Sequence, residues 1–281
     1  PAELLLSAAA GTSMMEIQQA LAAENQQLAF EPPDFSSLYG GNNSGTLGGT
    51  IAANLSGSKR LQAGAARDHF LGFEAVSGRG EEFKSGGRVV KNVTGFDLSK
   101  LLAGSFGTLA AMTSVTVKVL PKPDKTRTVL LYGLDDEAAV KALSETLQGP
   151  FEINSAAHLP ANIAAKSAVS YIASSGGSVA AVRVQGPEPS VEVRCRAVRA
   201  LWQAHGEVEE LHGHNSENLW QEVRDIAKLL SNPEDQIWRL SVPPSTGAGV
   251  VAAITGQLEG EYYYDWGGGL IWLALAAKAE N

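Results

Sequence analysis

The residues whose types and spacing could do chemistry are concentrated in one glycine-rich segment, residues 40–54, which reads GGNNSGTLGGTIAAN. Glycine adopts positive backbone dihedral angles and lets a ligand approach the backbone closely. Successive exposed N–H groups, or the N-terminus of a helix, can then bind a phosphate group. The segment predicts an anion-binding loop, with a plain flexible turn as the alternative.

Two common phosphate-binding loops are excluded by the spacing of these glycines. A P-loop ends in Gly-Lys-Ser/Thr, whereas Gly45 is followed by Thr46 and Leu47. The Rossmann fingerprint needs G-x-G-x-x-G between a strand and a helix, and this spacing does not occur in the sequence. We therefore expect no nicotinamide cofactor.

Composition narrows the class of protein and its partners. The chain has 281 residues, 44% of them hydrophobic, and a formal net charge of -8, so we expect two packed domains and no nucleic-acid partner. The one cysteine, Cys195, argues against an iron–sulfur cluster in this chain and is interpreted as a packing residue. The sequence contains no run of roughly 18 consecutive apolar residues, so it predicts no membrane span. We expect a cytoplasmic location, with the inner face of the membrane as the alternative.

Hydrophobic periodicity predicts the elements around the glycine-rich segment. Ser13 and Glu16 form the capping box of a first helix. The other expected elements are strands over 4–10 and 28–31, a helix over 46–55, a hairpin of 73–77 and 81–85, a helix over 97–102 and a strand over 111–120. Because Leu4, Leu5 and Leu6 are consecutive apolar residues, we expect the first strand to be buried on both faces.

The segment Pro121–Asp124 is the predicted boundary between two domains, residues 1–123 and 124–281. Beyond it, strands and helices alternate. The expected strands are 128–132, 179–184, 208–211, 237–242, 262–265 and 270–274, and the expected helices are 136–147, 189–205, 217–230 and one after Pro244. This pattern predicts an α+β domain with a largely antiparallel sheet.

Four blocks, in the same order, resemble the flavin domain of the vanillyl-alcohol-oxidase-like, PCMH-type FAD-binding family. They are residues 28–33 (LAFEPP), 46–54 (TLGGTIAAN), 64–72 (GAARDHFLG), and 91–98 (KNVTGFDL) with 102–109 (LAGSFGTL) and Met112-Thr113. The segments IWRLSVP at 237–243 and WGG at 266–268 with Trp272 are similar to the FAD-binding subunit of bacterial glycolate oxidases. The resemblance covers nearly the whole chain.

The resemblance implies FAD as the cofactor, an FAD-binding PCMH-type domain over 1–123 and an α+β cap domain over 124–281. Gly48 and Gly49 would offer N–H groups to the pyrophosphate, and residues 108–112 would line the adenine and ribityl side. Gly95 and Gly104 are either contacts or turn glycines. The full set of candidate cofactor-binding residues is Thr46, Leu47, Gly48, Gly49, Ala52, Ala53, Gly57, Gly64, Thr108, Ala111 and Met112.

The resemblance further implies an FAD-dependent oxidoreductase acting on CH–OH groups. It would take part in oxidising glycolate, or another small 2-hydroxy acid, together with a catalytic flavin subunit and an iron–sulfur subunit. The alternatives are a non-catalytic structural or electron-relay subunit, or another FAD-dependent 2-hydroxy-acid dehydrogenase of the family. The sequence assigns no catalytic base.

Three further side chains in the second domain are candidates for substrate or metal contacts. His212 and His214 are two residues apart, as a metal-binding pair on a strand would be, but their polar neighbours favour a solvated turn. We therefore predict no metal site. Arg239 could bind a carboxylate or pair with Asp265, and we expect it to face the same cavity as Trp266.

The family's flavin domain normally opens with a segment that forms a second pyrophosphate loop, and this sequence shows no counterpart of it. We therefore expect the flavin domain to be incomplete at its N-terminus, with an open edge on the first strand. We also expect the chain, expressed alone, to aggregate or to bind FAD weakly.

Overall fold

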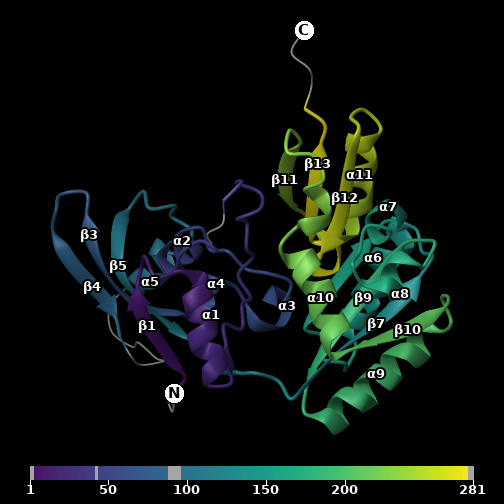
Figure 1. The fold of residues 1–281 in the computed structure, drawn as a ribbon, viewed down its shortest axis with the longest axis horizontal. Helices are drawn as coiled ribbons and strands as arrows, with labels where there is room; N and C mark the ends of the chain where they lie inside the picture. The colour runs from purple at the N-terminus through teal and green to yellow at the C-terminus, as the bar shows by residue number, and fades with distance from the viewer. Residues whose placement is uncertain (1–2, 42–43, 88–95, 278–281) are drawn as a thin grey trace. The chain divides into compact units, whose positions relative to one another are not determined.

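The computed structural model describes residues 3–41, 44–87 and 96–277, drawn in Figure 1. Most of the block at 91–98, including Gly95, lies outside these residues. The chain divides into two compact units, Pro1–Lys122 and Pro123–Asn281. The division falls inside the segment where the sequence places a domain boundary. Each unit is described by itself.

The first unit is built on a four-stranded antiparallel sheet in the order β1-β5-β3-β4. Short helices and a small two-stranded sheet, β2 with β6, complete it. The strands are β1 Leu5–Ala9, β2 Gln26–Gln27, β3 Phe70–Ser77, β4 Glu82–Gly86, β5 Ala110–Lys118 and β6 Leu120–Pro121. The helices are α1 Met14–Ala23, α2 Leu47–Ala52, α3 Arg60–Ala63, α4 Ala66–His69 and α5 Leu98–Leu102.

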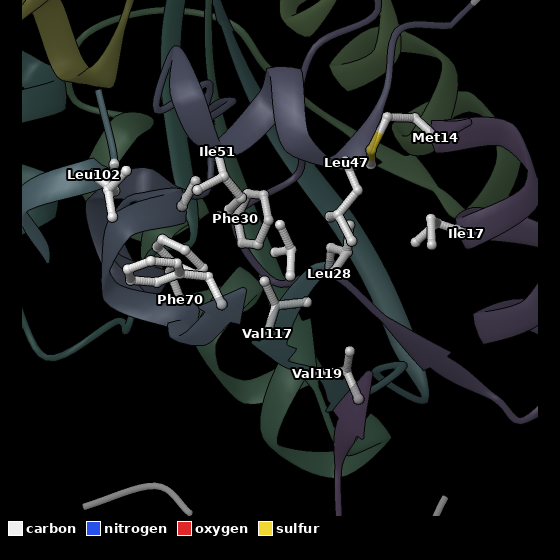
Figure 2. Close-up of a cluster of buried hydrophobic side chains, with 14 of the residues drawn as sticks. Met14, Ile17, Leu28, Phe30, Leu47, Ile51, Phe70, Leu102, Val117 and Val119 are labelled. Atoms are coloured by element: carbon white, nitrogen blue, oxygen red, sulfur yellow. The ribbon is translucent and has the colours of Figure 1, made fainter. Parts of the chain in front are cut away.

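The core of the first unit lies between this sheet and helices α1 and α2 (Figure 2). Val117 on β5 is fully buried, as the alternating pattern of that strand predicts. Leu47 and Ile51, four residues apart on α2, are also fully buried. Burial of each such side chain stabilises the fold by about 1.5–3 kcal/mol. The inner face of α2 therefore fixes the position of the glycine-rich segment.

Two expectations for this unit are wrong. Residues 28–31 form no strand, because the pairing lies earlier, at Gln26 and Gln27, and the φ of Glu31 is 43°. The first strand is not buried on both faces, since Leu5 and Leu6 are half-buried and Ser7 and Ala9 are exposed. The leucine run is split, because Leu4 has a φ of 52° and precedes the strand. In the described part of the chain, β1 pairs with β5 at the edge of the sheet.

The second unit holds a seven-stranded sheet in the order β10-β7-β9-β8-β12-β13-β11, and its strand pairs are antiparallel. This confirms the α+β class. The strands are β7 Lys125–Tyr132, β8 Ser155–Leu159, β9 Val179–Gly186, β10 Val208–His212, β11 Gln236–Ser241, β12 Gly260–Asp265 and β13 Leu270–Leu275. The helices are α6 Asp136–Gln148, α7 Ala161–Ala164, α8 Ser170–Ala173, α9 Glu188–Trp202, α10 Gly213–Arg224, α11 Gly247–Thr255, and the short 3-10 helices Ala227–Leu229, Pro244–Thr246 and Trp266–Gly268.

The two halves of this sheet meet at a narrow seam between β8 and β12. The ladder there consists of the single pair Tyr264–His158. The carboxylate of Asp136, at the start of α6, accepts hydrogen bonds from His158 Nε2 at 2.9 Å, Tyr262 Oη at 2.8 Å and Tyr264 Oη at 2.9 Å. One acidic side chain therefore ties a helix to both sides of the seam.

Candidate functional site

Helix α2 begins at the glycine-rich segment, and its first N–H groups are bonded within the protein. Thr46 is the N-cap, and its Oγ1 accepts a hydrogen bond from the Gly49 N–H at 3.1 Å. The Leu47 N–H donates to the Thr12 carbonyl at 3.0 Å, and the Gly48 N–H donates to the Ala10 carbonyl at 2.8 Å. The pyrophosphate role of Gly48 and Gly49 stays a prediction, and this arrangement shows a different use for their N–H groups.

Gly48 is required by close packing against the end of β1. A Cβ atom added at Gly48 would lie 2.7 Å from the Ala10 Cβ and 2.9 Å from the Ala10 carbonyl oxygen. Gly49, by contrast, is exposed, and a Cβ there would meet only the Thr46 Oγ1, at 3.2 Å. The two adjacent glycines therefore differ in what the fold demands of them.

The end of α2 lies against the loop that carries the GSFGTL block. The Gly104 N–H donates to the Ile51 carbonyl at 3.1 Å, and the Phe106 N–H donates to the Ala52 carbonyl at 2.9 Å. Two blocks that lie some fifty residues apart in the sequence are thus joined by the backbone. Helix α2 also packs against β5, so the candidate residues on α2 lie near the candidates Ala111 and Met112 on that strand.

The surface formed by residues 104–112 fits a flavin in its chemistry. Phe106 is 76% exposed and Leu109 is 51% exposed, so an apolar surface is available for a ring system. Thr108 and Ala111 are exposed and Met112 is half-buried. The Ser105 Oγ is buried and makes no hydrogen bond within the described residues. An exposed apolar surface suits a flavin ring, whereas the first N–H groups of α2 donate to acceptors within the protein.

Gly57 and Gly64 have clear roles in the fold. The Gly57 N–H donates to the Phe30 carbonyl at 2.9 Å. Gly64 has a φ of 83°, and a Cβ there would lie 2.8 Å from Asp68 Oδ2. That carboxylate accepts the Ala65 N–H at 2.9 Å, and this bond, with Lys100 nearby, holds the Asp68 pKa below its usual value despite partial burial. Cofactor contacts of Gly57 and Gly64 stay predictions.

His69, which lies in the block at 64–72, is a core residue. It is 6% exposed, and its Nε2 lies 2.8 Å from the Ala63 carbonyl. Its ring packs against Phe30 with centroids 5.4 Å apart. Burial lowers the pKa of His69, so its imidazole is neutral at neutral pH.

In the second unit, Arg239 lies over two indole rings, with its guanidinium carbon 5.0 Å from the Trp266 ring centre and 5.8 Å from that of Trp272. Arg239 is exposed, whereas both tryptophans are nearly buried. The buried Asp265 accepts the Trp266 N–H at 2.7 Å. Stacking on the two rings orients the guanidinium plane. Arg239 and Trp266 are thus neighbours, and carboxylate binding stays a prediction.

The expectation that His212 and His214 form a polar turn is wrong in its local structure. His212 is the last residue of β10, and His214 lies in the first turn of α10. His212 Nε2 is 3.3 Å from Glu210 Oε1, and His214 Nε2 is 3.1 Å from Asn218 Nδ2. Among residues 3–41, 44–87 and 96–277, no group of three His, Cys, Asp or Glu side chains is placed to hold a metal ion.

Comparison with known proteins identifies the family. Residues 1–86 match a family described as an FAD binding domain. The glycolate oxidase subunit GlcE of Escherichia coli (strain K12) is 30% identical over 278 residues, which are 99% of this chain and 67% of GlcE. The chain belongs to the GlcE family. Its N-terminal part is an FAD-binding domain, as the resemblance implies.

Other related proteins match a part of this chain. The glycolate oxidase subunit GlcD of Bacillus subtilis (strain 168) is 34% identical over 142 residues, 50% of this chain and 29% of that subunit. A D-lactate dehydrogenase of Archaeoglobus fulgidus is 35% identical over 113 residues, 40% of this chain and 24% of that enzyme. The solved structure of an alkyldihydroxyacetonephosphate synthase has a TM-score of 0.71 at 15% identity, over 99% of this chain and 59% of that one. This last likeness supports the fold alone.

This GlcE family member also contains features that the sequence did not reveal. The bonds from His158, Tyr262 and Tyr264 to Asp136 join residues far apart in the chain, so no local pattern signals them. Burial alone would raise the Asp136 pKa, but these hydrogen bonds lower it below its usual value. Cys195, by contrast, is buried as its interpretation as a packing residue implies, and burial raises its pKa to about 12. No helix in the described part of the chain is long and apolar enough to span a membrane.

Proposed function

We propose that this chain is the FAD-binding subunit of a complex that oxidises glycolate, or another small 2-hydroxy acid, to the corresponding 2-oxo acid. The observation that carries the proposal is the backbone link between α2 and residues 104–106 in a chain of the GlcE family. FAD, when bound, supplies an acceptor for the two electrons removed from the substrate. The residues of this chain bind and orient it.

The apolar surface at Phe106 and Leu109 takes a ring face. In the second unit, our candidate for contact with the substrate carboxylate is Arg239, whose guanidinium is oriented by stacking on two indole rings. We assign no catalytic base to this chain. A catalytic flavin subunit and an iron–sulfur subunit complete the proposed complex, which we place in the cytoplasm.

The test begins with the purified subunit and FAD. Flavin absorbance after gel filtration measures retention, and NAD serves as the matched control because the sequence carries no Rossmann fingerprint. We expect FAD to be retained by the subunit assembled with its partners and NAD not to be retained. Glycolate added to this complex should bleach the flavin absorbance. A complex without flavin in this subunit, at saturating FAD, would overturn the proposal.

The role of Arg239 has its own test in the assembled complex. Arg239→Lys keeps the charge but removes the planar fork, so we expect a rise in KM for glycolate of about tenfold or more with a smaller change in kcat. Arg194→Lys is the matched control, because Arg194 also lies in the second unit but bonds to backbone carbonyls of residues 151, 152 and 185. An equal KM for glycolate in both variants would show that Arg239 does not bind the substrate carboxylate.

A further inference from the structure

Asn54, the last residue of the glycine-rich segment, lies where three segments of the first unit meet. Its φ is 50°, in the left-handed region, where asparagine is one of the few residues other than glycine found regularly. Its own N–H donates to the Ile51 carbonyl at 3.0 Å. Asn54 therefore forms the turn that follows the C-terminal end of α2.

The side chain of Asn54 holds the start of helix α4. Its Oδ1 accepts the Arg67 N–H at 2.9 Å, and the neighbouring Ala66 N–H donates to the Ser56 Oγ at 2.9 Å. Both N–H groups belong to the first turn of α4, where a helix offers them no partner. The Arg67 carbonyl in turn accepts a hydrogen bond from Lys100 Nζ on α5. One amide side chain thus links α2 to α4 and, through α4, to α5.

The backbone turn at Asn54 also bears on the loop of the candidate flavin site. Gly104 has a φ of 83°, and a Cβ added there would lie 3.5 Å from the Asn54 Cβ, which is ordinary contact distance. The carbonyls just before the turn, those of Ile51 and Ala52, accept the N–H groups of Gly104 and Phe106. The Ile51 carbonyl thus accepts both the Asn54 N–H that closes the turn and the Gly104 N–H, so the turn at Asn54 and the start of the 104–109 loop share one backbone acceptor.

We propose that Asn54 is a positioning residue for the flavin site. Its left-handed backbone sets residues 104–109 against the end of α2, and its side chain sets α4. It touches no reacting atom. The flavin half of this inference rests on the proposed function, whereas the positioning half concerns only the polypeptide.

Three substitutions separate the backbone role from the side-chain role. Asn54→Gly keeps the left-handed turn and removes the acceptor for Arg67. Asn54→Asp keeps the acceptor in a residue that tolerates the turn. Asn54→Ala removes the acceptor and disfavours the turn. The control is Asn25→Ala, because Asn25 also has a left-handed φ, 53°, in the same unit, but it follows α1 rather than α2.

Amide hydrogen exchange followed by mass spectrometry gives the first readout, in full-length protein without FAD. We expect Asn54→Ala to speed exchange in peptides covering 104–109 by about tenfold, because the left-handed turn is disfavoured for alanine. Asn54→Gly should restore slow exchange at 104–109 but not at 66–69, and Asn54→Asp should restore both. Asn25→Ala should leave 104–109 unchanged. Equal exchange at 104–109 in Asn54→Ala and Asn25→Ala would overturn the inference, as would failure of Asn54→Gly to restore it.

The FAD dissociation constant of the assembled complex, from flavin fluorescence, gives the second readout. We expect the affinity to follow exchange at 104–109, so that Asn54→Gly binds FAD within about threefold of wild type and Asn54→Ala binds about tenfold more weakly. Wild-type affinity in Asn54→Ala, with exchange at 104–109 accelerated, would refute the flavin half. Loss of FAD from the wild type itself, with the expected exchange pattern, would overturn the proposed function and leave the positioning half standing.

Discussion

Replacement of Gly48 by alanine separates a packing role of this glycine from a phosphate-binding role. The added methyl group would lie 2.7 Å from the Ala10 Cβ, so either α2 or β1 must shift. A shift away from Ala10 lengthens the 2.8 Å bond between the Gly48 N–H and the Ala10 carbonyl. Overpacking costs about 1–3 kcal/mol and the weakened bond about 1 kcal/mol, while alanine in a helix regains at most about 1 kcal/mol. We expect the first unit to lose about 1–3 kcal/mol of stability.

The positions of the tryptophans allow the stability of the two units to be measured separately. The five tryptophans, at 202, 220, 238, 266 and 272, all lie in the second unit. Tryptophan fluorescence therefore reports unfolding of that unit, and far-ultraviolet circular dichroism reports both units. In urea, Gly48→Ala should shift the circular dichroism transition to lower urea and leave the fluorescence transition in place. Gly49→Ala is the matched control and should not lose stability, because Gly49 is exposed.

Equal stability of Gly48→Ala and Gly49→Ala would refute the packing argument. If Gly48→Ala then also lost FAD, the original interpretation of Gly48 as a phosphate ligand would be favoured.

Three further substitutions or treatments test other parts of the structure. Asp136→Asn should destabilise the second unit by about 1–3 kcal/mol at neutral pH, since the carboxylate accepts three hydrogen bonds. Because the pKa of Asp136 is lowered in the folded protein, this contribution is present above the unfolded pKa and is lost as the pH falls through the folded pKa. Fluorescence-monitored unfolding should thus show a pH dependence in the wild type that the variant lacks, and parallel pH profiles would contradict this. Burial raises the pKa of Cys195 to about 12, so this thiol should not react with iodoacetamide at neutral pH until urea unfolds the second unit. Mass spectrometry measures the labelling, and a labelled native protein would contradict the interpretation of Cys195 as a packing residue. Thr46→Ala should cost the first unit about 1 kcal/mol by removing the N-cap acceptor for the Gly49 N–H, and Thr46→Ser should not; equal circular dichroism midpoints for the two would contradict the capping role.

Patterns that depend on neighbouring residues were sufficient to predict much of the fold. The alternation at Val115, Val117 and Val119 predicts a strand with these side chains inside, and all three are fully buried, the first two on β5. Ser13 and Glu16 predict a capping box, and both of its hydrogen bonds form. In each case the physical cause lies within one element, so the sequence is enough.

The missed and misplaced features depend on contacts between distant segments. Strand β8, Ser155–Leu159, is buried at every position, so it shows no alternation from which to predict it. The FAD-binding family follows from ordered motifs, but the sequence suggests a phosphate ligand at Gly48 because glycine serves ligand approach and close packing equally well. Only the position of Ala10 shows that the fold needs glycine there.

The single-pair seam between β8 and β12 bears on how the second unit folds. Strands β11, β12 and β13 come from one stretch, residues 236–275, and β13 pairs with both β11 and β12. In the other half, β7 pairs with β10, so that Arg127 lies opposite His212. Pairings close in sequence cost less loop-closure entropy and form sooner. We expect strands β11, β12 and β13 to assemble first. Because one residue pair joins the two halves of the sheet, each half can reach its own strand register before the halves pack together.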